Sequence, residues 1–283
     1  MSAKSSTIGL VIPSLNQGKF LGQALENIFI QKNVSLRVAL CDAGSTDQTL
    51  SIAKQYMHQF TFFRSHPDKG QACAINEGIS RLGNTSYVGW LNADDVLLRE
   101  GLGAMAQFLD HHPECIAVFG KAYVIDEKGE ITGEYPTTPF CKRKFAVRCT
   151  ICQPGSLIRR RAWEAVGGVD ESFQTCIDYD LWWRLSKIGQ IGYLEQFVAC
   201  TRDHVQSKTR TLRMKVNEEA VSLLLRHRGM VPRNWCMANT LEALEDGRRL
   251  SIWERRWEAT RRYVQINRWK ALWPQNWLLL NRR

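Results

Sequence analysis

The feature that most constrains the fold is an alternation, within the first hundred residues, between short apolar runs and helical patterns. Apolar runs at residues 8–12, 34–41, 61–64 and 87–91 are typical of strands buried on both faces of a sheet. Between them, apolar side chains recur at helical spacing, as at Leu21, Leu25 and Ile28. Strand–helix repetition with short connections predicts an α/β fold, with a mostly parallel sheet flanked by helices.

Local signals predict where several helices begin and end. Residues 45–48 match a capping box, with the Ser45 hydroxyl at the N-cap. Gly70 opens a third helix, and Gly167-Gly168 ends a helix over residues 159–166. The second half is more mixed, with strands expected at 116–125, 190–194 and 197–201 and a helix over 178–187. From residue 212 onward the pattern is helical, interrupted near Pro232 and Pro274.

The charge of the chain is concentrated at its end. The net charge is +10, and residues 248–283 contain ten Arg or Lys against two acids, which accounts for +8 of it. The same segment holds five tryptophans. We therefore divide the chain into a domain over residues 1–210, with halves 1–97 and 98–210, and a basic, Trp-rich helical extension over 211–283.

Composition also bears on the cellular compartment. The nine cysteines are odd in number and scattered, unlike a disulfide framework. Neither a signal peptide nor a run of about 18 apolar residues is found. We expect a cytoplasmic protein with free, mostly buried thiols.

Polar side chains gather where the predicted strands end. Carboxyl ends of parallel strands meet at one edge of a sheet, where ligands bind. A lone aspartate there is usually a cap or turn residue, but several on one edge form an acidic pocket that suits Mg²⁺ or Mn²⁺. The polar residues at these ends are Ser14, Asn16, Asp42, Asp47, Asp68, Asn92 and Asp94.

Five blocks in the same order carry a resemblance to a known family. Four of them are residues 11–16 (VIPSLN), 41–47 (CDAGSTD), 68–70 (DKG) and 91–95 (LNADD), and the fifth is a downstream block that includes residues 153–156, 167–171, 178–182 and 202–204. Together they resemble the family 2 glycosyltransferases, which have the GT-A fold, over residues 7–210. The resemblance implies an inverting enzyme that transfers a sugar from a nucleoside diphosphate to a hydroxyl acceptor.

The resemblance also implies roles for single residues. Pro13, Ser14 and Asn16 would lie along the nucleotide, and Asp42 would accept a hydrogen bond from the base. A carboxylate suits the imide N–H of uracil or thymine, or the N–H groups of guanine. A UDP-sugar is the donor that we favour. Asp68 and Lys69 would lie near the nucleoside and diphosphate.

The triplet Asn92-Ala93-Asp94 matches the D-x-D motif of the family. It would contact donor and cation, with Asp94 as a direct ligand of a divalent cation, Mn²⁺ or Mg²⁺. His204 matches a histidine that faces the metal or the diphosphate. The sequence departs from the family at Asn92, where aspartate is usual. An amide can still bond a ribose hydroxyl or a metal-bound water, but it adds no charge.

Asp178 aligns with the catalytic base of the family, although the usual Glu-Asp motif is altered to Asp178-Tyr179-Asp180. The attacking hydroxyl must lose a proton, so a carboxylate has to lie within hydrogen-bond reach. Charge also grows on the departing diphosphate, where a cation is needed. A plainer interpretation makes Asp178 the N-cap of the helix beginning there. The two roles are compatible.

Alternatives remain for the extension and for the activity. A basic, Trp-rich amphipathic helix can lie in a membrane interface, or it can pack its tryptophans on the main domain. Nucleic-acid binding is disfavoured, since no such motif is present. A nucleotidyltransferase can use a similar sheet and metal, but residues 14–18 are a poor version of its phosphate loop. The third option is a catalytically silent module that binds nucleotide or membrane. Assembly of a surface polysaccharide or lipid-linked glycan is the expected process.

Overall fold

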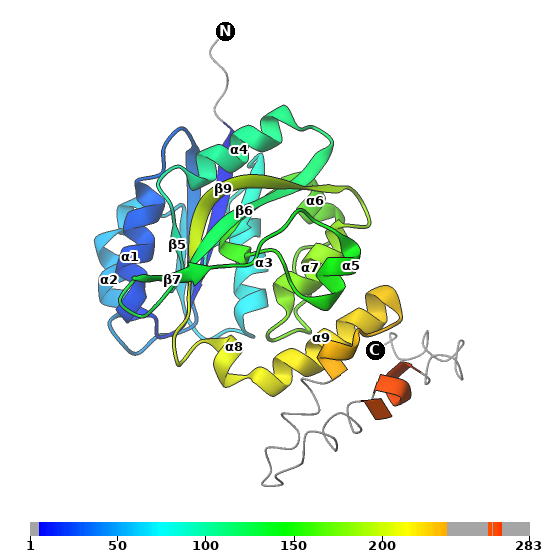
Figure 1. Ribbon diagram of the computed structural model, residues 1–283. Coiled ribbons are helices and arrows are strands. Elements are labelled where there is room, and N and C mark those ends of the chain that lie inside the picture. Colours follow the sequence, from blue (N-terminus) through cyan, green and yellow to red (C-terminus); the bar gives the residue numbers. More distant parts are fainter. Residues whose placement is uncertain (1–5, 237–259, 262, 268–283) are drawn as a thin grey trace. The chain divides into compact units, whose positions relative to one another are not determined.

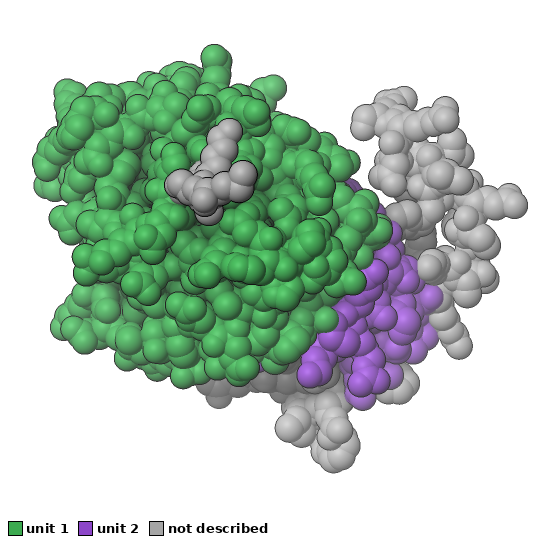
Figure 2. All heavy atoms as spheres, turned by 90° about the horizontal axis from the view of Figure 1, so that it is seen from above, with its two compact units in different colours: residues 1–140, 150–204 green, residues 141–149, 205–283 purple. Residues whose placement is uncertain are grey.

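The computed structural model describes residues 6–236, 260–261 and 263–267 (Figure 1). The chain divides into two compact units, coloured separately in Figure 2. The first comprises Met1–Phe140 and Thr150–His204, and the second Cys141–Cys149 and Val205–Arg283. The sequence predicted a boundary after residue 210 and did not anticipate that residues 141–149 belong with the second unit. The division of the first domain into halves at residue 97 stays a prediction.

The first unit is built on one sheet with the strand order β3-β2-β1-β4-β8-β6-β9-β5, and β7 pairs with β6 beside this path. The strands are β1 Thr7–Ser14, β2 Ser35–Asp42, β3 Phe62–Ser65, β4 Tyr87–Trp90, β5 Val96–Leu97, β6 Cys115–Ile125, β7 Ile131–Glu134, β8 Ser156–Arg159 and β9 Gln190–Arg202.

Strand direction determines which strand ends share an edge. β1, β2, β3 and β4 are mutually parallel, as predicted. β8 is antiparallel to both β4 and β6, and β9 is parallel to β6. β9 therefore runs in the same direction as β4, and both end at the same edge. We call this edge, formed by the ends of β1, β2, β3, β4 and β9, the carboxyl edge.

Helices cover both faces of the sheet (Figure 1). In the first unit these are α1 Gly18–Phe29, α2 Thr49–Gln55, α3 Gln71–Arg81, α4 Gly101–His111, α6 Arg160–Ala165 and α7 Ile177–Leu185, with short 3₁₀ turns η1 Met57–Gln59 and η2 Gln153–Gly155. The α/β class and the strand–helix alternation predicted for the first half are confirmed.

Alternation along the strands explains the two layers. Leu10 and Ile12 of β1 point to one face and join a buried cluster with Leu21 and Leu25 of α1. Val11 points to the other face, where α3 approaches so closely that a Cβ on Gly78 would lie 2.6 Å from the Val11 side chain. The missing side chain at Gly78 therefore allows α3 to lie directly on β1.

Two local predictions were wrong in an informative way. The capping box at residues 45–48 is not formed, because the helix begins at Thr49 and its N-cap, Gln48, makes no side-chain cap. The Ser45 hydroxyl instead donates to Asp42 and accepts from the backbone N–H of Asn16. The strands predicted at 190–194 and 197–201 are one strand, β9, with irregular register against β6.

The second unit contains α5 Lys142–Val147, α8 Lys208–Thr211 and α9 Arg213–Arg228. Gly229 ends α9 in the left-handed conformation, with φ of 71°. The side chains of Asn234 and Trp235 donate to the carbonyls of Val147 and Ala146. The five tryptophans of residues 248–283, Trp253, Trp257, Trp269, Trp273 and Trp277, lie outside the described residues. No helix in the described part of the chain has the length and apolarity to cross a membrane.

Candidate active site

The loops after β1 and β2 are fastened together at the carboxyl edge. Three successive backbone N–H groups donate to side chains of the second loop: Asn16 to Ser45 Oγ at 2.7 Å, Gln17 to Thr49 Oγ1 at 3.0 Å and Gly18 to Asp47 Oδ2 at 2.9 Å. A phosphate-binding loop needs such N–H groups free to face the ligand. Those of Asn16, Gln17 and Gly18 are already used inside the protein.

Ser14 ends β1 with a buried side chain. Its Oγ has no hydrogen-bond partner within the described structure. A buried polar atom without a partner costs roughly 1–3 kcal/mol. An orphaned hydroxyl at this edge is compatible with a site where a bound ligand supplies the missing partner, and the contact of Ser14 with the nucleotide stays a prediction.

Asp42, at the end of β2, is fully buried and surrounded by donors. Its carboxylate accepts from the N–H groups of Gly44 and Ser45, at 3.0 and 2.9 Å, and from Ser65 Oγ at 2.6 Å. The Ser45 hydroxyl is a fourth donor. A carboxylate offers about four acceptor sites. Three of these bonds fall on Oδ2 and one on Oδ1, so Asp42 shapes the loop from within, and its predicted contact with the base stays a prediction.

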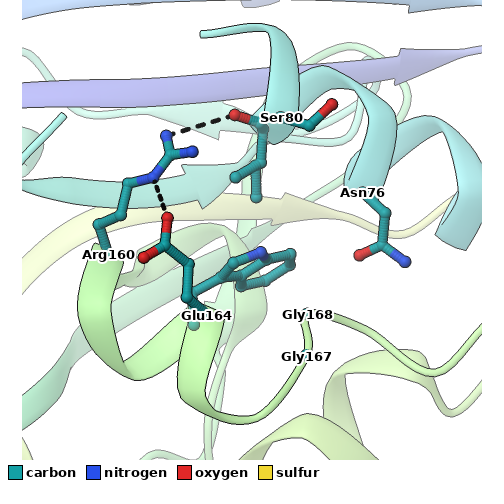
Figure 3. Close-up of a pocket in the computed structure, with 8 residues that line it drawn as sticks. Asn76, Ser80, Arg160, Glu164, Gly167 and Gly168 are labelled. Atoms are coloured by element: carbon teal, nitrogen blue, oxygen red, sulfur yellow. Dashed lines mark hydrogen bonds and ion pairs between the residues drawn. The ribbon is translucent and has the colours of Figure 1, made fainter. Parts of the chain in front are cut away.

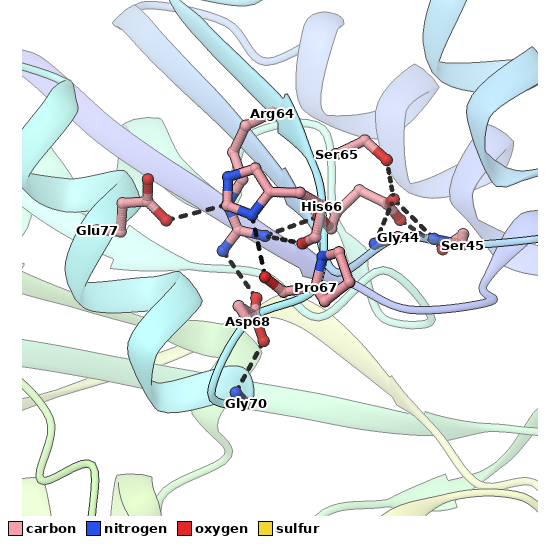
Figure 4. Close-up of polar contacts among 10 residues, drawn as sticks. Gly44, Ser45, Arg64, Ser65, His66, Pro67, Asp68, Gly70 and Glu77 are labelled. Atoms are coloured by element: carbon pink, nitrogen blue, oxygen red, sulfur yellow. Dashed lines mark hydrogen bonds and ion pairs between the residues drawn. The ribbon is translucent and has the colours of Figure 1, made fainter.

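Arg64 of β3 organises the loop that leads into α3 (Figure 4). Its buried guanidinium donates to Asp68 at 2.7 Å, to Glu77 at 2.9 Å and to the carbonyl of Asp42 at 2.7 Å. Asp68 also accepts from the backbone N–H of Gly70 at 2.7 Å. Asp68 thus holds the loop in place, and the adjacent Lys69 is exposed to solvent.

Asp94 and His204, the two predicted cation ligands, meet at the carboxyl edge. Asp94 Oδ2 lies 2.9 Å from His204 Nε2. The side chain of His204 is 3% exposed and that of Asp94 is 20% exposed. His204 follows the end of β9, and its ring packs against Phe20 of α1, with centroids 5.0 Å apart.

The pair suits a divalent cation. Two ligands at neighbouring corners of an octahedron around Mg²⁺ or Mn²⁺ lie about 3 Å apart, which matches the Asp94–His204 distance. Among the described side chains no group of three or more His, Cys, Asp or Glu gathers into a metal site. A two-residue site is sufficient for a cation that takes its other ligands from phosphate and water.

Asp95 lies directly behind this pair and is 4% exposed. Burial, with the neighbouring charge of Asp94 as a second cause, raises the pKa of Asp95 to about 7. Its carboxylate accepts from the N–H of Arg202 at 2.9 Å and from Asn92 Nδ2 at 3.0 Å. Arg202 in turn donates from Nε to the carbonyl of Asp94 at 2.8 Å. Ala93, between Asn92 and Asp94, is buried.

Asp178 is the second residue of α7, whose N-cap is Cys176. The N-cap role considered for Asp178 is therefore wrong, although its carboxylate does accept backbone N–H groups of the first turn. Burial raises the pKa of Asp178 to about 6, against these hydrogen bonds, which lower it. A carboxylate of raised pKa is suited to take up a proton near neutral pH.

The helix that carries Asp178 is anchored by an ion pair that the sequence analysis did not assign. Asp180, with no exposed side-chain surface, accepts from Arg184 Nε at 2.7 Å. The same guanidinium donates to the carbonyls of Val166 and Gly168, both at 2.7 Å. The i,i+4 spacing of an acid and an arginine was the available signal.

A surface pocket of about 390 Å³ lies along the second half of α3 and α6 (Figure 3). Its polar lining is already paired: Arg160 with Glu164 at 2.8 Å, and Asn76 with the carbonyl of Val169 at 2.9 Å. Trp163 forms its apolar part. None of the predicted site residues lines it, so we assign it no part in the chemistry.

The structure thus brings some predicted residues together and leaves others, Asp178 among them, apart. Asp94 contacts His204, Asn92 contacts Asp95, and Asn16 contacts the Asp42 loop through Ser45. Asp178 has no hydrogen bond to any of these within the described chain. Sequence analysis gave no role to Arg64, Gln71, Gln153 or Arg202. In the sequence, the sign that could have pointed to these residues is a polar side chain beside or within an apolar run.

The residues of the candidate site lie in a region that is similar to known proteins. The model of the family described as glycosyl transferase family 2 matches residues 10–167. This range, more than half of the chain, includes the Asp42 loop, the Asp68 loop and the Asn92–Asp94 triplet.

Two of the similar proteins bear the names of synthases. The chain is 27% identical over 191 residues to chondroitin synthase of Escherichia coli, covering 67% of this chain and 28% of that protein. It is 25% identical over 193 residues to hyaluronan synthase of Pasteurella multocida, covering 67% of this chain and 20% of that protein. The chain therefore spans less than a third of the length of these relatives.

Solved structures share the fold. TarS 1–349 of S. aureus superimposes with a TM-score of 0.63 at 15% identity, covering 92% of this chain and 80% of that one. The mannosyltransferase PcManGT from Pyrobaculum calidifontis, in complex with GDP-Man and Mn²⁺, gives 0.62 at 15% identity and covers 96% and 89%. The likeness confirms the expected GT-A type of fold.

Proposed function

The chain belongs to glycosyltransferase family 2, and from this premise we propose that it transfers a sugar, with inversion, from a nucleoside diphosphate donor to a hydroxyl group of a glycan or lipid-linked glycan. That it is a glycosyltransferase follows from the family. The donor class has support from two fold neighbours, TarS in complex with UDP-GlcNAc and PcManGT with GDP-Man. The observation that carries the proposal is the Asp94–His204 pair at the carboxyl edge.

The proposal assigns the cation to this pair. Asp94 and His204 would hold Mn²⁺ or Mg²⁺ through Oδ2 and Nε2, which lie at a spacing suited to two ligands. When bound there, a divalent cation supplies positive charge that stabilises the departing diphosphate. Support also comes from the Mn²⁺ in the PcManGT complex.

The remaining roles belong to side chains of the chain itself. Asp178 would accept the proton of the acceptor hydroxyl as that oxygen attacks the anomeric carbon. Asp42, with its loop, would shape the nucleoside side of the site from within, and Arg64 would hold the loop that presents Lys69. Lys69, exposed next to Asp68, would add positive charge near the diphosphate.

The alternatives differ in what they need. A nucleotidyltransferase would use free N–H groups in the loop after β1, and those of residues 16–18 donate to side chains. This favours the glycosyltransferase. A silent module would not need a base of raised pKa such as Asp178.

The test is a thermal-shift screen of the full chain with UDP, GDP, TDP and CDP, each with Mn²⁺ and with EDTA. We expect a shift of several degrees with one nucleotide, dependent on Mn²⁺ and lost in Asp94→Ala, because ligands that bind only the folded state raise its stability. The same donor class should then release nucleoside diphosphate on transfer. Release of pyrophosphate would identify a nucleotidyltransferase. Binding without any release would identify a silent module, and absence of every shift would contradict the proposal.

A further inference from the structure

Asn92 occupies the first position of the Asn92–Asp94 triplet, and its amide faces other side chains of the protein. Its Oδ1 accepts from Gln71 Nε2 at 2.7 Å. Its Nδ2 donates to Asp95 Oδ2 at 3.0 Å and, more weakly, to Gln153 Oε1 at 3.5 Å. Both ends of the amide are thus engaged within the first unit.

The hydrogen-bond partners of Asn92 determine the directions in which its amide oxygen and its amide nitrogen point. Gln153 is 8% exposed and donates from Nε2 to the carbonyl of Trp90 at 2.7 Å, so that its Oε1 faces Asn92. Asp95 also presents a carboxylate oxygen to Asn92. Two acceptors on one side require a donor, which an asparagine supplies and an aspartate does not.

A series of hydrogen bonds links Asn92 to Asp94 and His204, the proposed cation ligands. Asp95, held by Asn92, accepts the backbone N–H of Arg202 at 2.9 Å. Arg202 donates from Nε to the carbonyl of Asp94 at 2.8 Å. His204 is two residues after Arg202 and Asp94 two residues after Asn92, so the same few hydrogen bonds fix the backbone that carries both ligands.

We propose that Asn92 is a positioning residue: its amide nitrogen, by holding Asp95, orients Asp94 and His204 for the cation, and an aspartate at this position weakens cation binding. The inference rests on the proposed function for the identity of the cation. On this inference Asn92 is not a lost cation ligand. An aspartate at position 92, the residue usual in the family motif, would add negative charge near the cation and would still disturb the site.

The physical reason is repulsion between buried acceptors. In Asn92→Asp, a carboxylate oxygen lies near the Asp95 carboxylate, at the 3.0 Å now spanned by a hydrogen bond. Two acceptor oxygens that face each other at this distance in a buried place, with no donor between them, are strongly unfavourable. Exchanging the two residues removes the conflict between positions 92 and 95 and leaves only the longer 3.5 Å contact with Gln153 without a donor. In N92D/D95N the amide at position 95 donates to the carboxylate at position 92, and the amide oxygen can still accept from Arg202.

The experiment compares four full-length proteins: the wild type, N92D, D95N and N92D/D95N. Thermal unfolding without ligand comes first. We expect N92D to unfold at a lower temperature, and the double variant to recover at least half of the loss. Recovery in the double variant reports the pair itself, because a merely unsuitable residue at position 92 would not be rescued by a second change.

Mn²⁺ affinity is then measured by electron paramagnetic resonance titration, with the nucleotide that the thermal screen selects. We expect N92D to bind Mn²⁺ about tenfold more weakly, the size typical of outer-shell changes, and the double variant to recover most of it. An N92D protein that binds Mn²⁺ as tightly as the wild type, or a double variant without recovery in either measurement, overturns the inference alone. A wild type that binds no Mn²⁺ with any nucleotide overturns the proposed function and this inference together.

Discussion

The Asp178 carboxylate accepts hydrogen bonds from the backbone and also has a raised pKa. The carboxylate receives backbone N–H groups of the first turn of α7, yet burial keeps its pKa near 6. An acceptor hydroxyl approaching it would find a base that is ionised at neutral pH and still able to bind a proton.

Replacing the base tests the role directly. Asp178→Asn keeps the shape of the side chain and an oxygen that can accept the backbone N–H groups, but it cannot take up a proton, so we expect transfer to fall at least about a hundredfold. Nucleotide affinity should stay within about twofold, because the proposed base contacts the acceptor. Release of nucleoside diphosphate and nucleotide titrations check the two quantities. Glu195→Gln, an exposed carboxylate of the same unit, is the control, and near-normal turnover in Asp178→Asn would exclude the role.

The raised pKa also predicts a pH profile. A base works only when ionised, so kcat/KM should be level above pH 7 and fall about tenfold per unit below the pKa of about 6. A carboxylate with the ordinary value of 3.8 would keep its rate down to about pH 5. Initial rates between pH 5 and 8 decide this, with Mn²⁺ and nucleotide binding measured at each pH so that loss of the donor is not mistaken for protonation of the base.

At the scale of elements, the approach of α4 to β9 depends on a glycine. A Cβ on Gly101, the first residue of α4, would lie 2.2 Å from the carbonyl oxygen of Val198 in β9. This close contact lets α4 begin directly beside the strand that leads to His204.

Gly101→Ala should therefore destabilise the fold by about 1–3 kcal/mol, because backbone atoms cannot move aside as a flexible side chain can. Gly22→Ala in α1 is the matched control, since its Cβ would meet only Ile52 at 3.9 Å, and alanine favours a helix by up to about 1 kcal/mol. Urea unfolding of both variants checks the difference. Equal stability of the two would show that α4 has room to shift.

The elements differ in how far the sequence predicts them. β1, β2 and β4 followed from apolar runs bounded by turn residues, since a strand buried on both faces has little choice of composition. The capping box at residues 45–48 failed because a tertiary partner, Asp42, uses the Ser45 hydroxyl. A local pattern cannot show such competition.

The candidate site, like the secondary structure, could be predicted from the sequence only in part. Asp94 and His204 came from resemblance to a family, and the structure places their side chains in contact, while their role as cation ligands stays a prediction. The four acceptor bonds of Asp42 and the contacts of Asn92 with Gln71 and Gln153 were not predictable. They depend on side-chain direction at the ends of separate elements, which periodicity does not encode.

At the scale of the whole molecule, the basic extension gives the chain a second property to test. Residues 248–283 carry +8 and five tryptophans, a composition suited to an anionic membrane surface. We propose attachment at the cytoplasmic face of a membrane. A chain truncated after residue 247 should lose sedimentation with vesicles of anionic lipid and keep its nucleotide binding. Vesicles of phosphatidylcholine alone are the control, and equal sedimentation of both proteins would exclude a membrane role for the extension.

The contact between Asp94 and His204 joins residues 110 positions apart. Closing so long a stretch of chain is slow, so contacts of this kind form late in folding. A cation held by the two residues would stabilise an arrangement that the transition state for folding has not yet built. Adding the cation would then slow unfolding and lengthen the lifetime of the folded protein, while the rate of folding stayed nearly the same.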